Sequence, residues 1–375
     1  MKIGLYSVTD KALFDALNQA KVTHDDMKSL FFKRGIIISK DTKRKALALD
    51  FSRYFHGFDD YKRLSEILGT VGRKERVSSN IINTTLKKDS IEAAIKLVCE
   101  DLQKEGDQTD FIYTDKGIEV TIKYVKLDYK MSEFRQSSSR EATILIEQND
   151  SGEFTTRFPQ NAKSREFNDK LVNKIKEENA DTTISVDEIT LESVKDHEQR
   201  TDFFKELIDK IPNHTRIDVS DVYVTHPALE ERNKVSDIDS DDDDEDEDDN
   251  NPTVDKGYHI SKASLKGRGV LESKELNDLL SDGFYITKIV WVSVVTGLID
   301  SNKYEFEAQF VDPDNCTLFS YLIRGQYKYK SAGEYTNRQN VEKDKEVLLS
   351  SLIESAAREI SDKIIERNSL KINAA

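Results

Sequence analysis

The chain has 375 residues, of which 37% are hydrophobic and 34% charged, and a formal net charge of −15. This length is too great for one ordinary core, so two or three domains are expected. Cys99 and Cys316 have no Cys or His nearby at metal-ligand spacing, which argues against a disulfide scaffold and against a zinc site. No signal-peptide pattern and no run of about 18 apolar residues occurs, so we expect a cytoplasmic protein without a membrane span.

The charge is unevenly distributed along the chain. Residues 1–90 carry 18 Lys or Arg and 11 Asp or Glu, whereas 11 acidic residues crowd between Asp237 and Asp249. A block of like charges repels itself and cannot bury apolar surface, so residues 234–254 are predicted to be a disordered acidic linker. Three roles remain open for it: a solvating spacer, a competitor with nucleic acid for the protein's own basic face, or a docking site for a basic partner.

The first predicted domain, residues 1–84, is a small helical module. A helix is expected to begin after Thr23, a suitable N-cap, and to stop at Gly35, which tolerates a left-handed conformation. The next helix is expected to start near Asp41 or Thr42, and a further one to end at Gly69. Apolar residues at helical spacing mark the buried sides: Met27, Leu30, Phe31, Leu47, Phe51, Tyr54 and Phe55.

The order of elements between residues 24 and 58 carries a family resemblance. A short helix is followed by Arg34, Gly35 and Ile36, by an extended connection, by the pair Thr42 and Lys43, and by a helix with Leu47. This order resembles the SAP family of helix-extended-helix DNA-binding modules. The chain departs from the family just before the Thr-Lys pair, where Lys40 and Asp41 stand instead of the usual Gly. The resemblance implies DNA binding, while a generic helix-turn-helix fits the same residues.

The same stretch concentrates positive charge at the start of a helix. Three cations, Lys43, Arg44 and Lys45, fall in the first turn, where unpaired N–H groups and the helix dipole favour an anion. A bound phosphate would make their presence favourable. The predicted nucleic-acid surface consists of Lys33, Arg34, Lys40, Lys43, Arg44, Lys45 and Arg53. The alternative is that these side chains are only solvated.

Two α+β domains are predicted in the rest of the chain, at residues 85–233 and 255–375, after a polar boundary segment over residues 72–80. Each shows a helix, an antiparallel β-meander and a second helix. Helices are expected at 90–102, 164–178, 199–210, 273–283 and 342–367, and strands at 117–129, 140–149, 153–158, 182–194, 216–225, 257–265, 284–295, 303–310 and 317–329. The predicted fold class is therefore α+β.

The order helix, meander, helix also occurs in metal-dependent nucleases, which hold Mg²⁺ with an acidic residue and a Glu-x-Lys pair. The candidates are Asp150 with Glu153 and Glu305 with Glu307, but neither pair is followed by the required lysine. The default interpretation of Glu305 and Glu307 is a pair of surface glutamates. We therefore predict no catalytic residue, no metal ligand and no cofactor.

A secondary nucleic-acid surface is predicted within residues 321–338, where Tyr alternates with Arg and Lys. On a strand, two tyrosines would share one face and stack bases, while two lysines would share the other. The members of this surface are Arg324, Tyr327, Lys328, Tyr329 and Lys330. An ordinary half-buried sheet explains the same pattern.

Together these patterns predict a non-enzymatic nucleic-acid-binding subunit, with DNA favoured over RNA. It would act as an accessory or recognition subunit beside a separate effector enzyme, and the lack of familiar housekeeping motifs suggests a prokaryotic defence or mobile-element system. Two alternatives stay open: a protein–protein interaction adaptor without a nucleic-acid role, and a divergent metal-dependent nuclease.

Overall fold

The structure is a computed structural model that describes residues 8–69, 74–114, 117–130, 133–134, 136–149, 152–179, 183–226 and 261–374. The chain divides into two compact units. Unit 1 comprises Met1–Glu75 and Thr84–Ile184, and unit 2 comprises Arg76–Asn83 and Ser185–Ala375. The predicted acidic linker, residues 234–254, lies outside the described residues.

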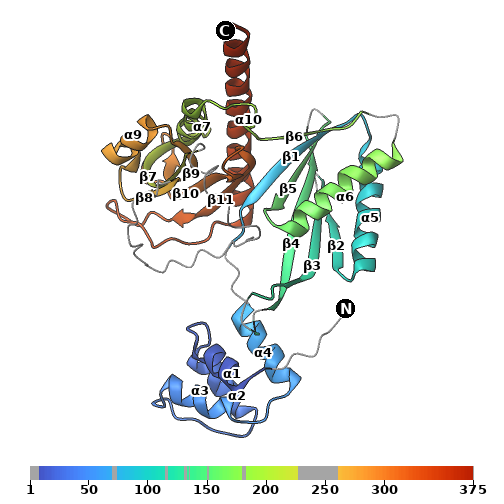
Figure 1. Cartoon of the computed structure of the whole chain (residues 1–375), viewed down its shortest axis with the longest axis vertical. Coiled ribbons are helices and arrows are strands. Elements are labelled where there is room, and N and C mark those ends of the chain that lie inside the picture. The colour runs from blue at the N-terminus through green and yellow to red at the C-terminus, as the bar shows by residue number, and fades with distance from the viewer. Residues whose placement is uncertain are drawn as a thin grey trace. The chain divides into compact units, whose positions relative to one another are not determined.

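The first part of unit 1 is a bundle of short helices, residues 8–69, which we call the helical module (Figure 1). Its helices are α1 (Asp10–Asn18), α2 (His24–Phe32), α3 (Arg44–Ser52) and α4 (Phe58–Gly69), and their apolar sides meet in one buried cluster. α2 begins as predicted, because Thr23 and Asp26 form a reciprocal capping box. The predicted left-handed stop is confirmed by Gly35, which has a φ of +73°.

α3 begins close to the predicted position but ends earlier than predicted. Its N-cap is Lys43, which puts the predicted triplet of cations at the start of the helix. The helix ends before Tyr54 and Phe55, which the sequence predicts to be helical. The imidazole Nε2 of His56 lies 2.7 Å from the carbonyl oxygen of Phe51, where a continuing helix would place a backbone N–H. The same carbonyl accepts the N–H of Tyr54 at 3.1 Å, so a tight turn and a side chain together take the place of the next helical hydrogen bond.

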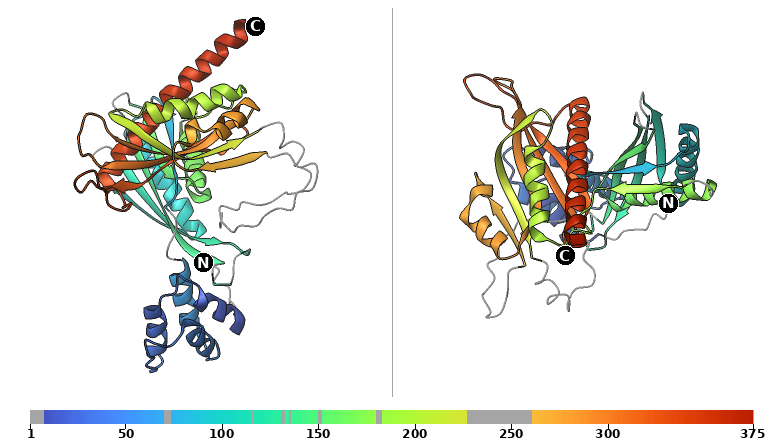
Figure 2. Two further views of the ribbon diagram at one scale, coloured as in Figure 1. Left: turned by 90° about the vertical axis from the view of Figure 1, so that its left-hand side faces the viewer. Right: turned by 90° about the horizontal axis from the view of Figure 1, so that it is seen from above.

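The rest of unit 1 is an antiparallel sheet with two helices on one face (Figures 1 and 2). The strands pair in the order β2 (Gln108–Tyr113), β3 (Gly117–Leu127), β4 (Ser137–Gln148) and β5 (Phe154–Pro159). The covering helices are α5 (Lys88–Glu105) and α6 (Ala162–Glu178). Alternate residues of β3, such as Ile118, Val120 and Ile122, are buried. The predicted meander is confirmed, with β2 as an additional edge strand whose residues are half-buried or exposed.

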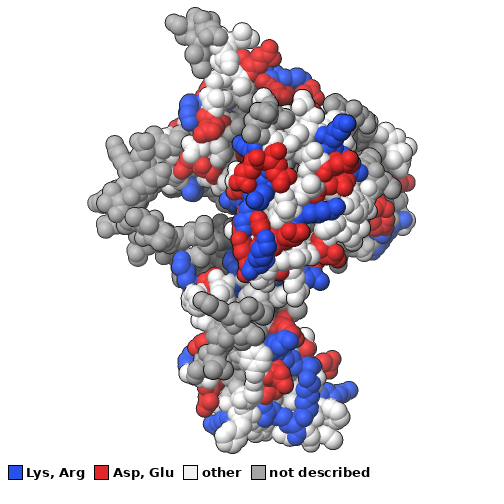
Figure 3. Space-filling view, turned by 90° about the vertical axis from the view of Figure 1, so that its right-hand side faces the viewer, with Lys and Arg blue, Asp and Glu red and all other residues white. Residues whose placement is uncertain are grey.

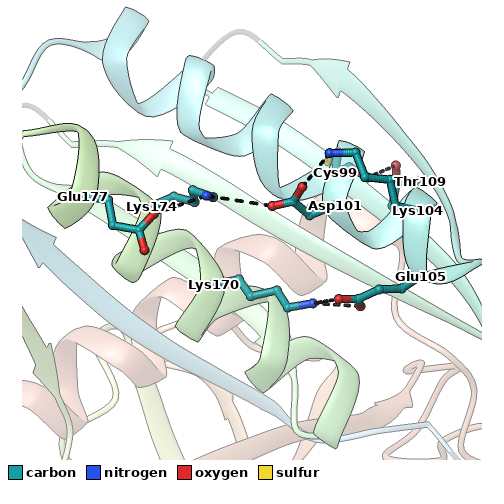
Figure 4. A network of polar contacts seen from close by, with 8 residues as sticks. All are labelled: Cys99, Asp101, Lys104, Glu105, Thr109, Lys170, Lys174 and Glu177. Atoms are coloured by element: carbon teal, nitrogen blue, oxygen red, sulfur yellow. Dashed lines mark hydrogen bonds and ion pairs between the residues drawn. The ribbon is translucent and has the colours of Figure 1, made fainter.

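Charged side chains link the outer sides of α5 and α6 (Figure 4). Lys170 lies 2.7 Å from the Glu105 carboxylate, and Lys174 lies 4.0 Å from Asp101, which Lys104 also contacts. Exposed ion pairs of this kind contribute little to stability. The packing of the helices therefore depends mainly on their buried apolar sides, which in α5 include Ile95.

Unit 2 is built on a larger antiparallel sheet (Figure 1). Its strands pair in the order β11 (Thr317–Tyr327), β10 (Lys303–Asp312), β9 (Tyr285–Val295), β7 (His214–Thr225) and β8 (Lys262–Lys266), with β1 (Val77–Asn83) beside β11 and β6 (Ser185–Glu188) beside β1. The helices are α7 (His197–Asp209), α9 (Lys274–Ser281) and α10 (Lys343–Ala374), and η1 (Val270–Glu272) is a 3-10 turn. Phe203 of α7 packs on the rings of Phe310 and Phe319, and the Tyr321 hydroxyl donates to Glu354 of α10. One face of the sheet thus carries both α7 and α10.

The predicted boundary at residues 72–80 contains the point where the chain passes from unit 1 to unit 2, between Glu75 and Arg76, but the segment from Val77 on is not a loop, because Val77–Asn83 form strand β1. Ser78 and Asn80 are buried in this strand although they are polar. The hydroxyl of Ser78 donates to the carbonyl oxygen of Phe319 at 2.8 Å, so the side chain is satisfied inside the sheet. A strand of this kind has no apolar alternation by which the sequence could reveal it.

The position of β7 changes both the predicted domain limits and the interpretation of the acidic segment. The sequence predicts residues 85–233 as one domain, yet β7 pairs with β9 and with β8 in unit 2. Thr225 lies opposite Lys262, and the N–H of His226 donates to the carbonyl oxygen of Ser261 at 2.8 Å. Residues 227–260 therefore connect neighbouring strands of one sheet, rather than joining two domains.

Replacement of residues 228–259 by a four-residue Gly/Ser loop should preserve the fold. The strands on both sides of the segment are already paired, and each halving of a loop lowers its closure entropy by roughly 0.6 kcal/mol. About three halvings should therefore stabilise unit 2 by up to about 2 kcal/mol. Thermal unfolding followed by circular dichroism measures the change. A clear fall in Tm would show instead that the replaced segment packs on the folded protein.

Candidate nucleic-acid interface

The seven predicted cations of the helical module fall into two groups. Arg34 and Arg44 are half-buried and have partners inside the module. The other five are exposed, and no carboxylate of the described residues lies within salt-bridge distance of them. We call these five the unpaired cations: Lys33, Lys40, Lys43, Lys45 and Arg53. The structure thus separates cations that support the fold from cations that can contact a ligand.

Arg34 holds the end of α2 against the chain that follows α3. Its Nη2 donates to the Asp60 carboxylate at 2.6 Å and lies 3.1 Å from Nδ1 of His56. Its guanidinium carbon lies 5.0 Å from the ring centre of Phe51 and 5.8 Å from that of Tyr54. A charge-assisted hydrogen bond and two cation–π contacts make this side chain part of the module's framework.

The N-terminus of α3 combines backbone donors with exposed lysines. Arg44 turns away from this end, since its Nη1 donates to the carbonyl oxygen of Gln19 at the end of α1, at 2.5 Å. The N-cap Lys43 supplies no side-chain acceptor, and the first turn contains no acidic residue. The first N–H groups of the helix therefore lack both an intrahelical partner and a cap, beside the ammonium groups of Lys43 and Lys45. This is a suitable place for a phosphate group.

The exposed side of α3 extends this positive surface. Lys45, Leu49 and Arg53 follow each other at four-residue intervals and are exposed, so they lie along one side of the helix. Between Lys28 and Arg53 the chain has eight Lys or Arg and only two Asp. In Figure 3, Lys and Arg side chains gather on the helical module at the bottom of the view. The module therefore presents a locally positive surface although the whole chain is acidic.

The secondary surface predicted from the alternation of Tyr and Lys is divided by the end of β11. The strand stops at Tyr327. Tyr329 lies beyond it and packs edge-on against Tyr335, with ring centroids 5.5 Å apart. Lys328 and Lys330 are exposed. The strand face that the sequence predicts for the two tyrosines does not reach Tyr329, because the strand has already ended.

The sequence predicts that Glu305 and Glu307 of β10 are surface glutamates, and this prediction is wrong. They are only 7% and 3% exposed. They lie in the middle of the sheet, between β9 and β11, and cationic side chains cover them. We call this group the buried charge cluster: Arg76, Lys288, Glu305, Glu307, Arg324 and Arg338. Burial of two carboxylates is tolerated because cations surround both of them.

The contacts of the cluster join five segments of unit 2. Arg76 Nε lies 2.7 Å from the Glu307 carboxylate and Lys288 Nζ lies 3.3 Å from it. Arg338 Nη1 lies 2.6 Å from Glu305. The predicted nucleic-acid residue Arg324 lies between the two carboxylates, 3.6 Å from Glu307 and 3.9 Å from Glu305. No local pattern could reveal this cluster, since Arg76, Lys288 and Arg338 come from distant parts of the sequence.

Burial alone would raise the pKa of Glu307, but the positive charges of Arg76, Lys288 and Arg324 outweigh it and hold this pKa below its usual value. The carboxylate is thus ionised and neutralised by cations, an arrangement unlike a Mg²⁺ site. The other nuclease candidate does not form a site either: Glu153 accepts a hydrogen bond in a tight turn, and Asp150 lies outside the described residues. Among the residues that the structure describes, no group of three or more His, Cys, Asp or Glu is placed to hold a metal ion.

Both cysteines are buried free thiols. Burial raises the pKa of Cys99, and it raises that of Cys316 to about 12. Each is therefore protonated at neutral pH and unsuited to act as a nucleophile. None of the described helices has the length and apolar composition needed to cross a lipid bilayer.

Comparisons with protein-family models, with curated proteins and with solved structures found no match to this chain. The likeness to SAP modules stays a prediction that rests on the residues between 24 and 58.

The substitution Glu307→Gln should destabilise unit 2 by about 3–5 kcal/mol at pH 7, because it leaves buried cations without their carboxylate. The folded-state pKa of Glu307 is lowered, so its contribution is complete above the unfolded value of 4.5 and is lost as the pH falls through the folded value. The difference in the free energy of unfolding between variant and wild type should therefore decrease below pH 4.5. Urea unfolding at pH 7 and pH 4 measures it, with Glu141→Gln in the exposed pair with Lys123 as control. A gap that stays constant with pH would contradict this electrostatic account.

Proposed function

We propose that this chain binds nucleic acid through the unpaired cations of its helical module and serves as a recognition or accessory subunit for a separate effector enzyme. The observation that carries the proposal is the group of five exposed cations at the end of α2, in the following connection and on α3, none of which has a carboxylate partner in the part of the chain that the structure describes. Nucleic-acid binding depends largely on the neutralisation of phosphates by such side chains. DNA is the favoured ligand because the same residues resemble a DNA-binding family.

The contacts within the module support this proposal in a second way. Arg34 and Arg44 fix the end of α2 and the start of α3, so the unpaired cations stand on a rigid support. Phosphate contacts position a nucleic acid without reading its sequence. The proposed interface therefore predicts binding with strong salt dependence and weak sequence preference.

The variant Lys33→Ala, Lys40→Ala, Lys43→Ala and Lys45→Ala should lose most of its affinity for nucleic acid and keep its thermal stability. Removal of exposed cations, two of them at a helix N-terminus, removes no internal contact. A plot of the logarithm of the binding constant against the logarithm of the salt concentration has a negative slope. Its magnitude should decrease by roughly 0.9 for each phosphate that is no longer neutralised, hence by up to about 3.6. Fluorescence anisotropy between about 50 and 200 mM salt measures both effects. Arg44 stays unchanged because its hydrogen bond to Gln19 is structural.

A matched control removes the same charge from elsewhere. Lys104, Lys123, Lys210 and Lys363 are also exposed, but each has a carboxylate partner in the described structure. Their replacement by alanine should leave affinity within about twofold. Equal losses in both variants would mean that only the total charge matters, and unchanged affinity in the first variant would overturn the assignment of the module.

Replacement of residues 228–259 by the short loop should raise affinity for nucleic acid at low salt. The change removes 14 acidic and three basic residues and moves the net charge from −15 to −4, which reduces the repulsion of phosphate. The gain should be clear near 50 mM salt and should fade towards 500 mM, because the screening length shortens to a few ångströms as the salt approaches about 1 M. Filter binding with the intact and shortened chains tests it. Equal affinity at low salt would show that the acidic segment acts only as a spacer or as a docking site.

A further inference from the structure

The helical module exposes large apolar side chains beside its unpaired cations. Phe55 is 98% exposed, Ile37 85% and Phe32 69%, and these are three of the five most exposed large apolar side chains among the described residues. Three such side chains in one small module are candidates for contact with a ligand. The sequence did not reveal it, because helical spacing predicts Phe55 on the buried side of a helix that in fact ends before it.

The end of α2 and the turn after α3 lie against each other. The rings of Phe31 and Tyr54 pack with centroids 6.0 Å apart, and Nη2 of Arg34 lies 3.1 Å from Nδ1 of His56. Phe32 and Phe55 each follow one of the two packed rings in sequence. Both therefore belong to the same end of the module, where Lys33 and Arg53 are also exposed.

Ile37 is exposed because of its position in the extended connection between α2 and α3. Ile36 and Ile38 pack against the core of the module, and side chains alternate along an extended chain. Ile37 therefore points outward, between Lys33 and Lys40 in the sequence. A side chain that alternates outward in this way does not contribute to the core and is free to contact a ligand.

The turn that carries Phe55 is held by hydrogen bonds on both sides. His56 contacts the carbonyl of Phe51 through Nε2, which donates, and the guanidinium of Arg34 through Nδ1, which accepts. Asp60 accepts from both Arg34 and the N–H of Gly57. The exposed ring is thus mounted on a fixed backbone, which lowers the entropy lost when a ligand stacks on it.

We infer that the helical module binds single-stranded nucleic acid, with Phe55 stacked on an unpaired base and the unpaired cations on the phosphates. This inference rests on the proposed function. Bases in a duplex are stacked on each other and present only their edges, whereas a single strand offers a base face to an aromatic ring. The positive surroundings, eight Lys or Arg against two Asp between Lys28 and Arg53, favour an anionic polymer over an apolar protein segment as the occupant.

The test compares the full chain with Phe55→Ala and Phe55→Trp on three labelled probes: a 20-nucleotide oligothymidine, a 20-nucleotide oligouridine and a 20-base-pair mixed-sequence DNA duplex. One stacked base contributes about 1–3 kcal/mol, which at 1.4 kcal/mol per tenfold corresponds to a loss of roughly 5- to 140-fold. Phe55→Ala should show this loss on single strands and less than about a twofold change on the duplex. Phe55→Trp should retain affinity, since it keeps an aromatic face.

Tyr129→Ala provides the matched control, because Tyr129 is 75% exposed and lies outside the helical module. It should change no affinity. Phe55 contributes almost no buried surface, so all variants should keep the wild-type Tm. The ratio between the two single-stranded probes shows whether DNA or RNA is preferred.

The possible results separate the inference from the proposed function. An equal loss on duplex and single strands, or no loss in Phe55→Ala, overturns stacking; if the lysine variant still loses affinity, phosphate binding by the module stands. Absence of binding to all three probes by the wild-type chain overturns both proposals. A loss confined to single strands, rescued by Phe55→Trp, supports the inference.

Discussion

The side chain of Arg34 is the interaction on which the candidate interface depends. It joins the end of α2 to residues beyond α3 through the Asp60 carboxylate, the His56 imidazole and the face of Phe51. His56 in turn contacts the carbonyl of Phe51 near the end of α3, so Arg34 and His56 together link α2 to the turn in which α3 ends. The unpaired cations and the exposed rings stand on the segments that Arg34 connects. The sequence predicts that Arg34 binds phosphate, whereas in the structure it positions the segments that carry the unpaired cations.

Cations in this protein have different roles according to their burial. In the buried charge cluster, Arg76 and Lys288 are mostly covered and lie against Glu307, since an isolated buried charge would be very unfavourable. Between α5 and α6, the half-buried Lys170 has a carboxylate partner on the neighbouring helix, Glu105. In the helical module, by contrast, the five unpaired cations have no such partner among the described residues. The module is distinguished by unpaired cations that lie close together in the sequence and have no carboxylate partner among the described residues, and not by the number of its cations.

Local signals predicted the parts of the fold that local interactions determine. The Thr23 cap, the Gly35 stop and the meander of unit 1 depend on residues close in sequence, and the structure confirms them. The missed features depend on distant partners. Polar Ser78 can be buried in β1 because its hydroxyl donates to the carbonyl oxygen of Phe319, 241 positions away. Glu307 can be buried because it accepts a hydrogen bond from Arg76, 231 positions away. The grouping of β7 with β9 across the acidic segment likewise follows from pairing that no short pattern encodes.

The same limit applied to the candidate interface. Its positive charge was visible in the sequence because the cations are neighbours along the chain, whereas the separation of Arg34 and Arg44 from the others required their contacts with Asp60 and Gln19. Exposure of Phe55 could not be predicted either, because it depends on the early end of α3 at the His56 contact.

The acidic net charge does not contradict a nucleic-acid interface. Charges act over roughly 8–10 Å at physiological salt, so acidic residues further away than this are largely screened.

The start of α3 is an example of a locally positive site. The α5 helix also has an uncapped lysine N-cap, Lys87, but its first turn contains Asp89, and Lys88 lies 3.8 Å from Glu92. α3 has neither an acidic residue in its first turn nor a partner for Lys43 among the described residues. An N-cap of Ser, Thr or Asp would stabilise α3 by about 0.5–2 kcal/mol relative to a residue that cannot cap. The start of α3 lacks this stabilisation, and its lysines also interact unfavourably with the positive end of the helix dipole. A bound phosphate would accept from the free N–H groups and neutralise the lysines, which would make the interaction favourable.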